Sequence, residues 1–177
     1  MSCPWLAATV LALILLPAAP AAAGTRLKYI AGNPALTVEV PDGWTAEEER
    51  YNIVHPLEFR PKKGAVPYRL QMFYFPIGDT EHPQQFVRAF AEQQAQDDQL
   101  AKASYAPPDN QTNDQNVPVT LQILTGRRNG VDHRYVFMYF VVKNHGYLLA
   151  VNGPADTFDQ AKSVTEAIMN SVRPLKK

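Results

Sequence analysis

The segment that most constrains the fold is residues 133–142 (HRYVFMYFVV), which is apolar at both parities. Successive side chains of a β-strand point to opposite faces, so Tyr135 and Phe137 would face one way and Val136 and Met138 the other. A strand with two apolar faces needs cover on both of them. The sequence therefore predicts an interior strand in a sheet that carries a packed layer on each side.

Strands are also predicted on either side of this segment. The strand after it consists of residues 147–151. The strand before it alternates, so that four apolar side chains share a face: Val117, Val119, Leu121 and Ile123. Asn129-Gly130 and residues 144–146 are typical of tight hairpin turns. Because hairpin connections join antiparallel strands, the three segments predict an antiparallel meander.

Two amphipathic helices are predicted. The first begins near His82, with Pro83 where a missing N–H costs little. It fades in the polar stretch 93–98, and Ala103 is its furthest predicted extent. Its apolar stripe is Phe86, Val87, Phe90, Ala91 and Ala95. The second begins near Asp156 or Thr157 and ends before Pro174. Its apolar stripe is Phe158, Ala161, Val164, Thr165, Ile168 and Val172. Both stripes repeat with helical spacing.

Further strands are predicted at residues 27–30, 36–40, 53–60 and 68–75. Two polar stretches are not predicted to be strands. The acidic run 47–50 is interpreted as a solvated loop or one helical turn, and residues 109–115 (DNQTNDQ) as a mobile loop. Together the elements predict an α+β fold, an antiparallel β-sheet of about six strands flanked by helices on both faces (an α/β/α sandwich).

The first 23 residues are predicted to be a cleaved signal peptide. Residues 5–16 are apolar but too short to span a bilayer comfortably, and Ala21 to Ala23 offer small residues for cleavage. No Lys or Arg precedes the apolar run, which departs from the usual signal pattern. The alternative is a retained membrane anchor. We then expect one domain over residues 24–177, periplasmic or secreted. Removal of Cys3 would leave no disulfide, which favours a bacterial envelope protein.

Charge gives no reason to expect nucleic acid or stable membrane insertion, because 17 Lys and Arg balance 17 Asp and Glu. The Lys62-Lys63 and Arg127-Arg128 pairs are interpreted as solvated turns, since tracking a phosphate backbone requires a larger basic patch.

No catalytic, metal-binding or cofactor-binding residue is assigned. Three serines remain after signal cleavage, none in a nucleophile elbow: Ser104, Ser163 and Ser171. Four histidines lack metal-site spacing: His55, His82, His133 and His145. A metal site would require the strands of His55 and His133 to be neighbours. Eight aromatic residues are interpreted as core packing rather than a ligand box: Tyr68, Phe73, Tyr74, Phe75, Tyr135, Phe137, Tyr139 and Phe140.

Three segments, in chain order, carry a resemblance to a known family: VEVPDGW at 38–44, HGYLLAVNGP at 145–154 and MNSVRP at 169–174. Together they resemble the PsbP-like fold family. The resemblance implies an antiparallel sheet of about six strands between helices, and no shared active site. That family includes photosystem II extrinsic subunits, a nuclear-transport factor that binds a small GTPase, and exported bacterial proteins of unknown role. The resemblance therefore implies binding to another macromolecule, with no functional residue to carry over.

These observations favour an exported, non-enzymatic protein-binding or accessory domain of the bacterial envelope, whose partner is another envelope protein. The alternative is a binder of a small hydrophobic ligand between sheet and helix. A hydrolase with an unrecognised site is a third and weaker candidate. For protein binding, the surfaces chosen are residues 44–51 and 105–116, where aromatic and polar residues mix. The oligomeric state is left open.

Overall fold

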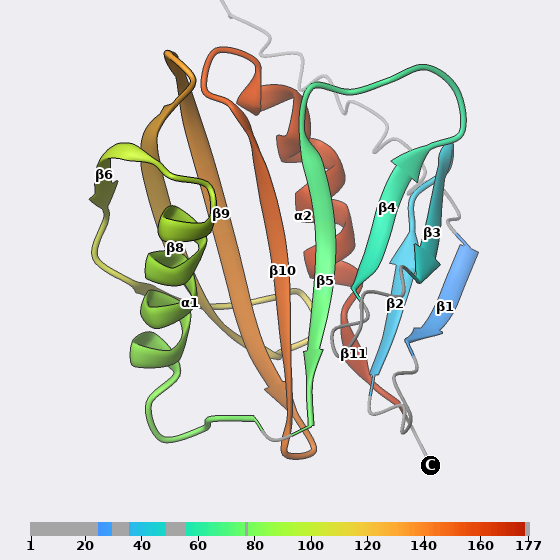
Figure 1. The fold of residues 1–177 in the computed structure, drawn as a ribbon. Coiled ribbons are helices and arrows are strands. Elements are labelled where there is room, and N and C mark those ends of the chain that lie inside the picture. Colours follow the sequence, from blue (N-terminus) through green and yellow to red (C-terminus); the bar gives the residue numbers. More distant parts are fainter. Residues whose placement is uncertain (1–24, 30–35, 49–55, 77, 176–177) are drawn as a thin grey trace, which may run out of the picture.

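The computed structural model describes residues 25–29, 36–48, 56–76 and 78–175. A large antiparallel sheet forms the centre of the molecule (Figure 1), with strand order β3-β4-β5-β10-β9-β8-β6 and β7 paired beside β6 on the outer edge of β8. Its eight strands are β3 (Trp44–Glu48), β4 (Leu57–Pro61), β5 (Arg69–Phe75), β6 (Ala101–Tyr105), β7 (Asp109–Thr112), β8 (Pro118–Arg128), β9 (Val131–Val142) and β10 (His145–Pro154). The prediction of about six strands is therefore corrected to eight.

A second, three-stranded sheet lies beside the first, with β2 at its centre. Its strands are β1 (Thr25–Tyr29), β2 (Leu36–Val40) and β11 (Arg173–Pro174). The helices are α1 (Pro83–Asp97), the short 3₁₀ turn η1 (Phe158–Ala161) and α2 (Lys162–Ser171). The three strands predicted around residues 133–142 and the second predicted helix are thus the meander β8–β9–β10 followed by η1 and α2.

The predicted interior position of residues 133–142 is confirmed, because β9 pairs with β8 on one side and β10 on the other. The β8–β9 hairpin turns at Asn129 and Gly130, which have φ of 50° and 81°, as a type I′ turn requires. The next turn falls at Lys143 and Asn144, one residue earlier than predicted, again with positive φ at both positions.

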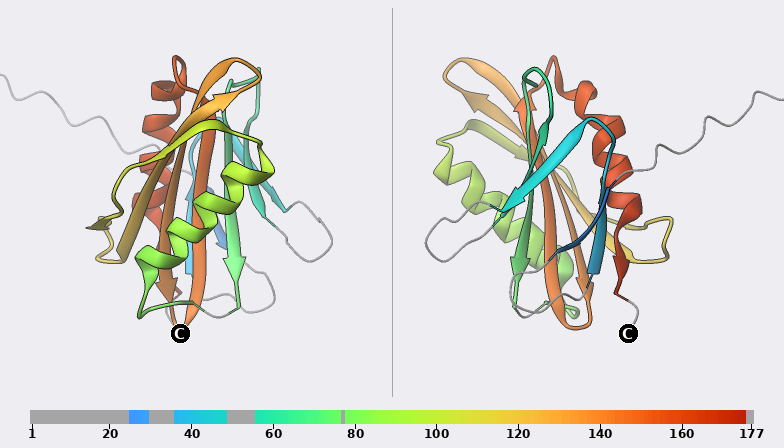
Figure 2. Two further views of the ribbon diagram at one scale, coloured as in Figure 1. Left: turned by 60° about the vertical axis from the view of Figure 1, so that its left-hand side comes forward. Right: turned by 90° about the vertical axis from the view of Figure 1, so that its right-hand side faces the viewer.

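The two faces of the main sheet are covered by different elements. In Figure 2 the sheet lies between α1 and α2. We call the side packed against α1 the α1 face, where Tyr135, Phe137 and Tyr139 join Val87 and Ala91 in one core cluster. We call the other the α2 face, where the alternate β9 residues Met138, Phe140 and Val142 pack in the cluster that contains Val164 and Ile168. The predicted alternation of β9 is therefore confirmed.

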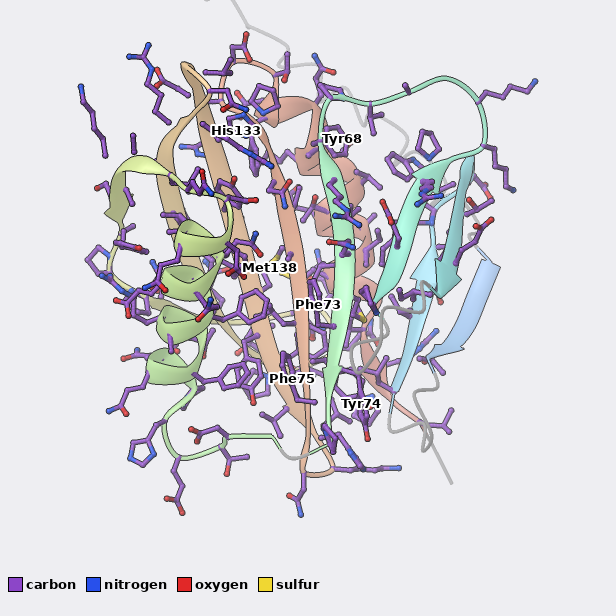
Figure 3. All side chains as sticks on the ribbon, viewed as in Figure 1. Tyr68, Phe73, Tyr74, Phe75, His133 and Met138 are labelled. Carbon is purple, nitrogen blue, oxygen red and sulfur yellow. The ribbon has the colours of Figure 1, made fainter. Side chains whose placement is uncertain are left out.

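The aromatic residues pack as predicted. Four of them are labelled in Figure 3. Tyr68, one residue before β5, and Tyr74 of β5 belong to the α2 face, whereas Phe73 and Phe75 of β5 belong to the α1 face. The Phe75 ring lies 5.0 Å from the Phe86 ring of α1 in an edge-to-face arrangement. Such contacts are those of a filled core layer.

The prediction that α1 continues to Ala103 is wrong. The helix ends at Asp97, and the chain turns through Gln99, which has φ of 52°, into β6. The two polar stretches also differ from prediction. Glu47 lies in β3, and residues 109–112 form β7. Both are edge strands, which pair on one side only, so the neighbouring backbone can order them without an apolar pattern.

No helix among residues 25–29, 36–48, 56–76 and 78–175 is long and apolar enough to cross a membrane. The predicted signal peptide, residues 1–23, lies outside the described residues. Of the strand predicted at 53–60, residues 53–55 lie outside the described residues, and β4 begins at Leu57.

Candidate functional site

The serines that the sequence offered as nucleophile candidates have structural or exposed positions. Ser171 Oγ accepts a hydrogen bond from the Glu39 N–H at 2.8 Å and donates one to the Ile168 carbonyl at 2.7 Å. Ser104 and Ser163 are exposed. Ser171 therefore ties the end of α2 to β2, and no histidine pairs with it among the described contacts.

The histidines do not converge. His82 precedes α1 and His145 begins β10, where its Nδ1 lies 2.9 Å from the Tyr74 hydroxyl. β5 and β10 separate β4 from β9, so the strands that His55 and His133 were placed on are not neighbours. His55 itself lies outside the described residues. Within the part of the chain that the structure describes, no three His, Cys, Asp or Glu residues are close enough to hold a metal ion.

The structure instead shows a groove of about 380 Å³ between α2 and the β8–β9 part of the α2 face. We call it the α2 groove. Its apolar lining consists of Leu121, Val136, Met138, Val151, Phe158 and Met169. Its polar lining consists of Gln111, Arg134, Asp159, Lys162, Thr165 and Glu166. The site therefore has an apolar base with charged groups at its margin.

The end of α2, beside the groove, is held by Asn113, which follows β7. The Asn113 side-chain amide donates to the carbonyls of Met169 and Val172, both at 2.9 Å. Its carbonyl oxygen accepts the N–H groups of Gln115 and Val117. In Figure 1 the yellow segment between β6 and β8 passes behind β9. The segment predicted to be a mobile loop thus includes strand β7, whose Gln111 lines the groove, and Asn113, which is hydrogen-bonded to the end of α2.

One polar group inside the groove has no partner. Thr165 is 7% exposed and its Oγ1 makes no hydrogen bond within the described residues. An unsatisfied buried hydroxyl costs about 1–3 kcal/mol. The sequence placed Thr165 correctly on the buried stripe of the second helix, but could not show that its hydroxyl lines a groove.

A second hollow of about 550 Å³ adjoins the groove at the β8–β9 hairpin. We call it the basic pocket, and its lining is Lys102, Thr125, Gly126, Arg127, Asp132, His133, Arg134 and Ala155. Arg127 Nε lies 3.3 Å from Asp132 Oδ1 and donates to the Gly130 carbonyl. The Arg134 guanidinium lies 5.7 Å from the centre of the Phe158 ring and lines both hollows. The two sites are therefore contiguous.

The strongest electrostatic perturbation lies on the other side of the sheet. Burial raises the pKa of the Tyr135 hydroxyl well above its usual range, and the adjacent Asp98 carboxylate raises it further, against a smaller opposing effect of Arg128. The hydroxyl donates to Asp98 Oδ2 at 2.7 Å. This group stays protonated and joins β9 to the end of α1, so we interpret it as structural.

Comparison with known proteins finds no matching family model and no matching curated protein. Solved structures do match. CyanoP of Synechocystis sp. PCC 6803 superposes with a TM-score of 0.62 at 12% identity, over 91% of this chain and 99% of that one. The fold is PsbP-like. The resemblance expected from the sequence is thereby confirmed as a resemblance of fold.

Two further structures share the PsbP-like fold. LpqN of Mycobacterium tuberculosis, described as involved in cell envelope biogenesis, matches with a TM-score of 0.61 at 11% identity, over 86% of this chain and 91% of LpqN. A Pseudomonas aeruginosa protein of unknown function matches with a TM-score of 0.51 at 12% identity, over 80% of this chain and 92% of that one. At these identities the PsbP-like fold alone is shared.

Within this PsbP-like fold, the two surfaces chosen from the sequence lie at opposite edges of the main sheet. Residues 44–48 form β3 at one edge, and residues 105–116 include the end of β6 and all of β7 at the other. Residues 49–51 lie outside the described residues. Only the second surface borders the α2 groove, through Gln111. Their role in binding stays a prediction.

Proposed function

We propose that the protein is an exported, non-enzymatic accessory domain of the bacterial envelope that binds a segment of another envelope protein in the α2 groove. The signal-like residues 1–23 support export. The fold supports a place in the envelope, because LpqN, described as involved in cell envelope biogenesis, has it too. The single observation that carries the proposal is the α2 groove, an open apolar hollow with a charged margin.

The groove has the composition of a protein interface. Three of its apolar residues, Leu121, Val136 and Met169, are only half-buried, so their side chains are accessible to a partner. Lys162 and Glu166 lie at the margin on successive turns of α2, 4.0 Å apart. Protein interfaces combine an apolar centre with a polar rim in this way. A partner would therefore gain most from apolar side chains placed against β8, β9 and α2.

The test is a crosslinked pull-down in the native envelope, with the chain expressed from Met1 and read by mass spectrometry. Met169→Glu places a charge in the groove on a helical position that tolerates Glu. Ala167→Glu adds the same charge at an exposed position of the same helix. We expect wild type and Ala167→Glu to recover one stoichiometric protein, and Met169→Glu to recover at least about tenfold less. Equal recovery by both variants would contradict the proposal.

A second candidate is a small ligand with an apolar body and one hydrogen-bonding group. The volume of about 380 Å³ favours it, because small-molecule sites commonly occupy about 300–1,000 Å³ with mostly apolar linings. The free Thr165 hydroxyl would meet the polar group. Native mass spectrometry of wild type and Met169→Glu distinguishes this candidate, which requires an added mass that the variant loses.

A further inference from the structure

We infer that the α2 groove and the basic pocket form one elongated site, which binds an extended partner segment with apolar side chains at one end and a carboxylate at the other. This rests on the proposed function and names the chemistry of the segment. The carboxylate belongs to an acidic side chain or to a chain terminus.

The two hollows are joined by a strip of the α2 face along β8 and β9. Cross-strand partners in an antiparallel pair share a face. From the groove toward the hairpin, the successive pairs on this face change from apolar to charged: Leu121 with Met138, Ile123 with Val136, Thr125 with Arg134, and Arg127 with Asp132. In Figure 3, Met138 and His133 mark the middle and the hairpin end of β9. Arg134 lies where the side chains of the strip change from apolar to charged.

The length of the strip sets the length of the segment. A strand rises about 3.4 Å per residue, so the six steps from Leu121 to Arg127 span about 20 Å. An extended segment needs about six residues to cover the same distance. The apolar anchor and the carboxylate should therefore be separated by about five or six positions.

The charge of the basic pocket favours an anion. Lys102, Arg127 and Arg134 line it together with one carboxylate, Asp132. Apart from His133, the lining therefore carries two positive charges in excess. Arg127 already pairs with Asp132. Within the described residues, no carboxylate pairs with Lys102 or Arg134. These two side chains are therefore the ones available for charge-assisted hydrogen bonds to a carboxylate.

The orphaned hydroxyl favours a peptide over an acyl chain. Thr165 Oγ1 is buried without a partner at the apolar end of the site. An acyl chain in the groove would leave that hydroxyl unpaired and keep its desolvation cost. An extended peptide carries an N–H or a carbonyl at every residue and can satisfy it. The groove chemistry therefore fits a polypeptide segment.

The test is a selection from a random library of displayed linear nine-residue peptides, against the chain expressed from Met1 and purified from the envelope fraction. Three proteins are compared: wild type, the double variant Lys102→Gln with Arg134→Gln, and the control Lys62→Gln with Lys63→Gln, which removes the same charge from an exposed loop. Thermal unfolding confirms that each is folded. We expect wild type and control to enrich apolar residues five or six positions from an acidic residue or terminus.

The best selected peptide is then measured by fluorescence anisotropy in acid and amide forms. On wild type and on the control, conversion of the carboxylate to an amide should weaken binding about tenfold. On the double variant the same conversion should change the affinity less than about twofold, because the side chains that bind the carboxylate are absent. If the double variant still binds the acid form about tenfold more tightly than the amide form, the inference is overturned. Enrichment of apolar residues without acids also overturns it, while leaving the proposed function intact. Enrichment of no peptide contradicts both.

Discussion

The two faces of the main sheet each receive one helix, but they are filled to different degrees. On the α1 face, Phe86 and Phe90 of the 15-residue α1 reach the aromatic rings of β5 and β9. On the α2 face, α2 has 10 residues, and the β8–β9 strip beside it remains half-exposed at Leu121 and Val136. Both faces contribute a buried core, but only the strip of the α2 face beside α2 leaves apolar side chains partly accessible, which is what the proposed binding requires.

The sharpest test of this difference compares two adjacent residues of β9. Phe137 is 1% exposed on the α1 face, whereas Val136 is half-buried in the α2 groove. We expect Phe137→Ala to lower the free energy of unfolding by about 3–5 kcal/mol, because it leaves a cavity. Val136→Ala should cost less than about 1.5 kcal/mol. Urea unfolding followed by circular dichroism measures both, and equal costs would show that the faces are packed alike.

The position of the end of α2 beside the groove should depend on Asn113. Asn113→Ala removes hydrogen bonds to the carbonyls of Met169 and Val172 and leaves buried polar groups unpaired. We expect a loss of about 2–3 kcal/mol in the free energy of unfolding. The exposed neighbour Gln115 provides the control, since Gln115→Ala keeps its backbone contact and should change stability by less than about 0.5 kcal/mol. Hydrogen exchange at the end of α2 should accelerate in the first variant only.

The α1 face should also be sensitive to alkaline pH. The unfolded chain releases the Tyr135 proton near pH ~10, whereas the folded chain retains it because burial and Asp98 raise the pKa of the hydroxyl. The stabilisation is therefore complete below pH ~10 and declines by about 1.4 kcal/mol per pH unit above it. Unfolding at pH 8 and pH 11 should show a smaller decline for Tyr135→Phe than for wild type. Identical declines would contradict this interpretation.

The smallest expected effect has the opposite sign and lies in the groove. Thr165→Val replaces an unpaired buried hydroxyl with a methyl group of similar size, so we expect the free chain to become about 1 kcal/mol more stable. Thr157→Val is the contrast, because the Thr157 hydroxyl donates to the Pro154 carbonyl and its loss should not stabilise. Peptide binding by Thr165→Val should weaken. A hydroxyl kept at the expense of stability is consistent with a role in binding.

Much of the α1 face was predictable, because apolar residues recur there with strand and helix periods. Tyr135 and Phe137 alternate with Val136, and the stripe of α1 follows helical spacing. The edge strands could not be predicted from the spacing of apolar residues. For example, β7 has the sequence DNQT, and all four of its side chains are exposed. Its order comes from backbone pairing with β8, which leaves no hydrophobic pattern.

The candidate site was less accessible to sequence reasoning. Arg127 is exposed as predicted, but it lies in β8 rather than in the turn. Its proximity to Lys102 and Arg134 depends on how β6 meets β8 through an irregular register. Asn113 lies in a stretch without apolar residues, yet it is 4% exposed because it binds two carbonyls that lie 56 and 59 positions away. Both features arise from tertiary placement rather than from local periodicity.

The small sheet has a consequence for the order of folding. Its central strand β2 pairs with β11, and Arg173 also contacts Glu39 across 134 positions of the chain. Closing so long a loop is entropically costly, and contacts of this separation slow folding. Leu36 of β2 can therefore pair with Pro174 of β11 only after residue 174 has been synthesised, even if the other strands have already paired. A chain shortened before Arg173 would leave β2 without one of its two neighbouring strands.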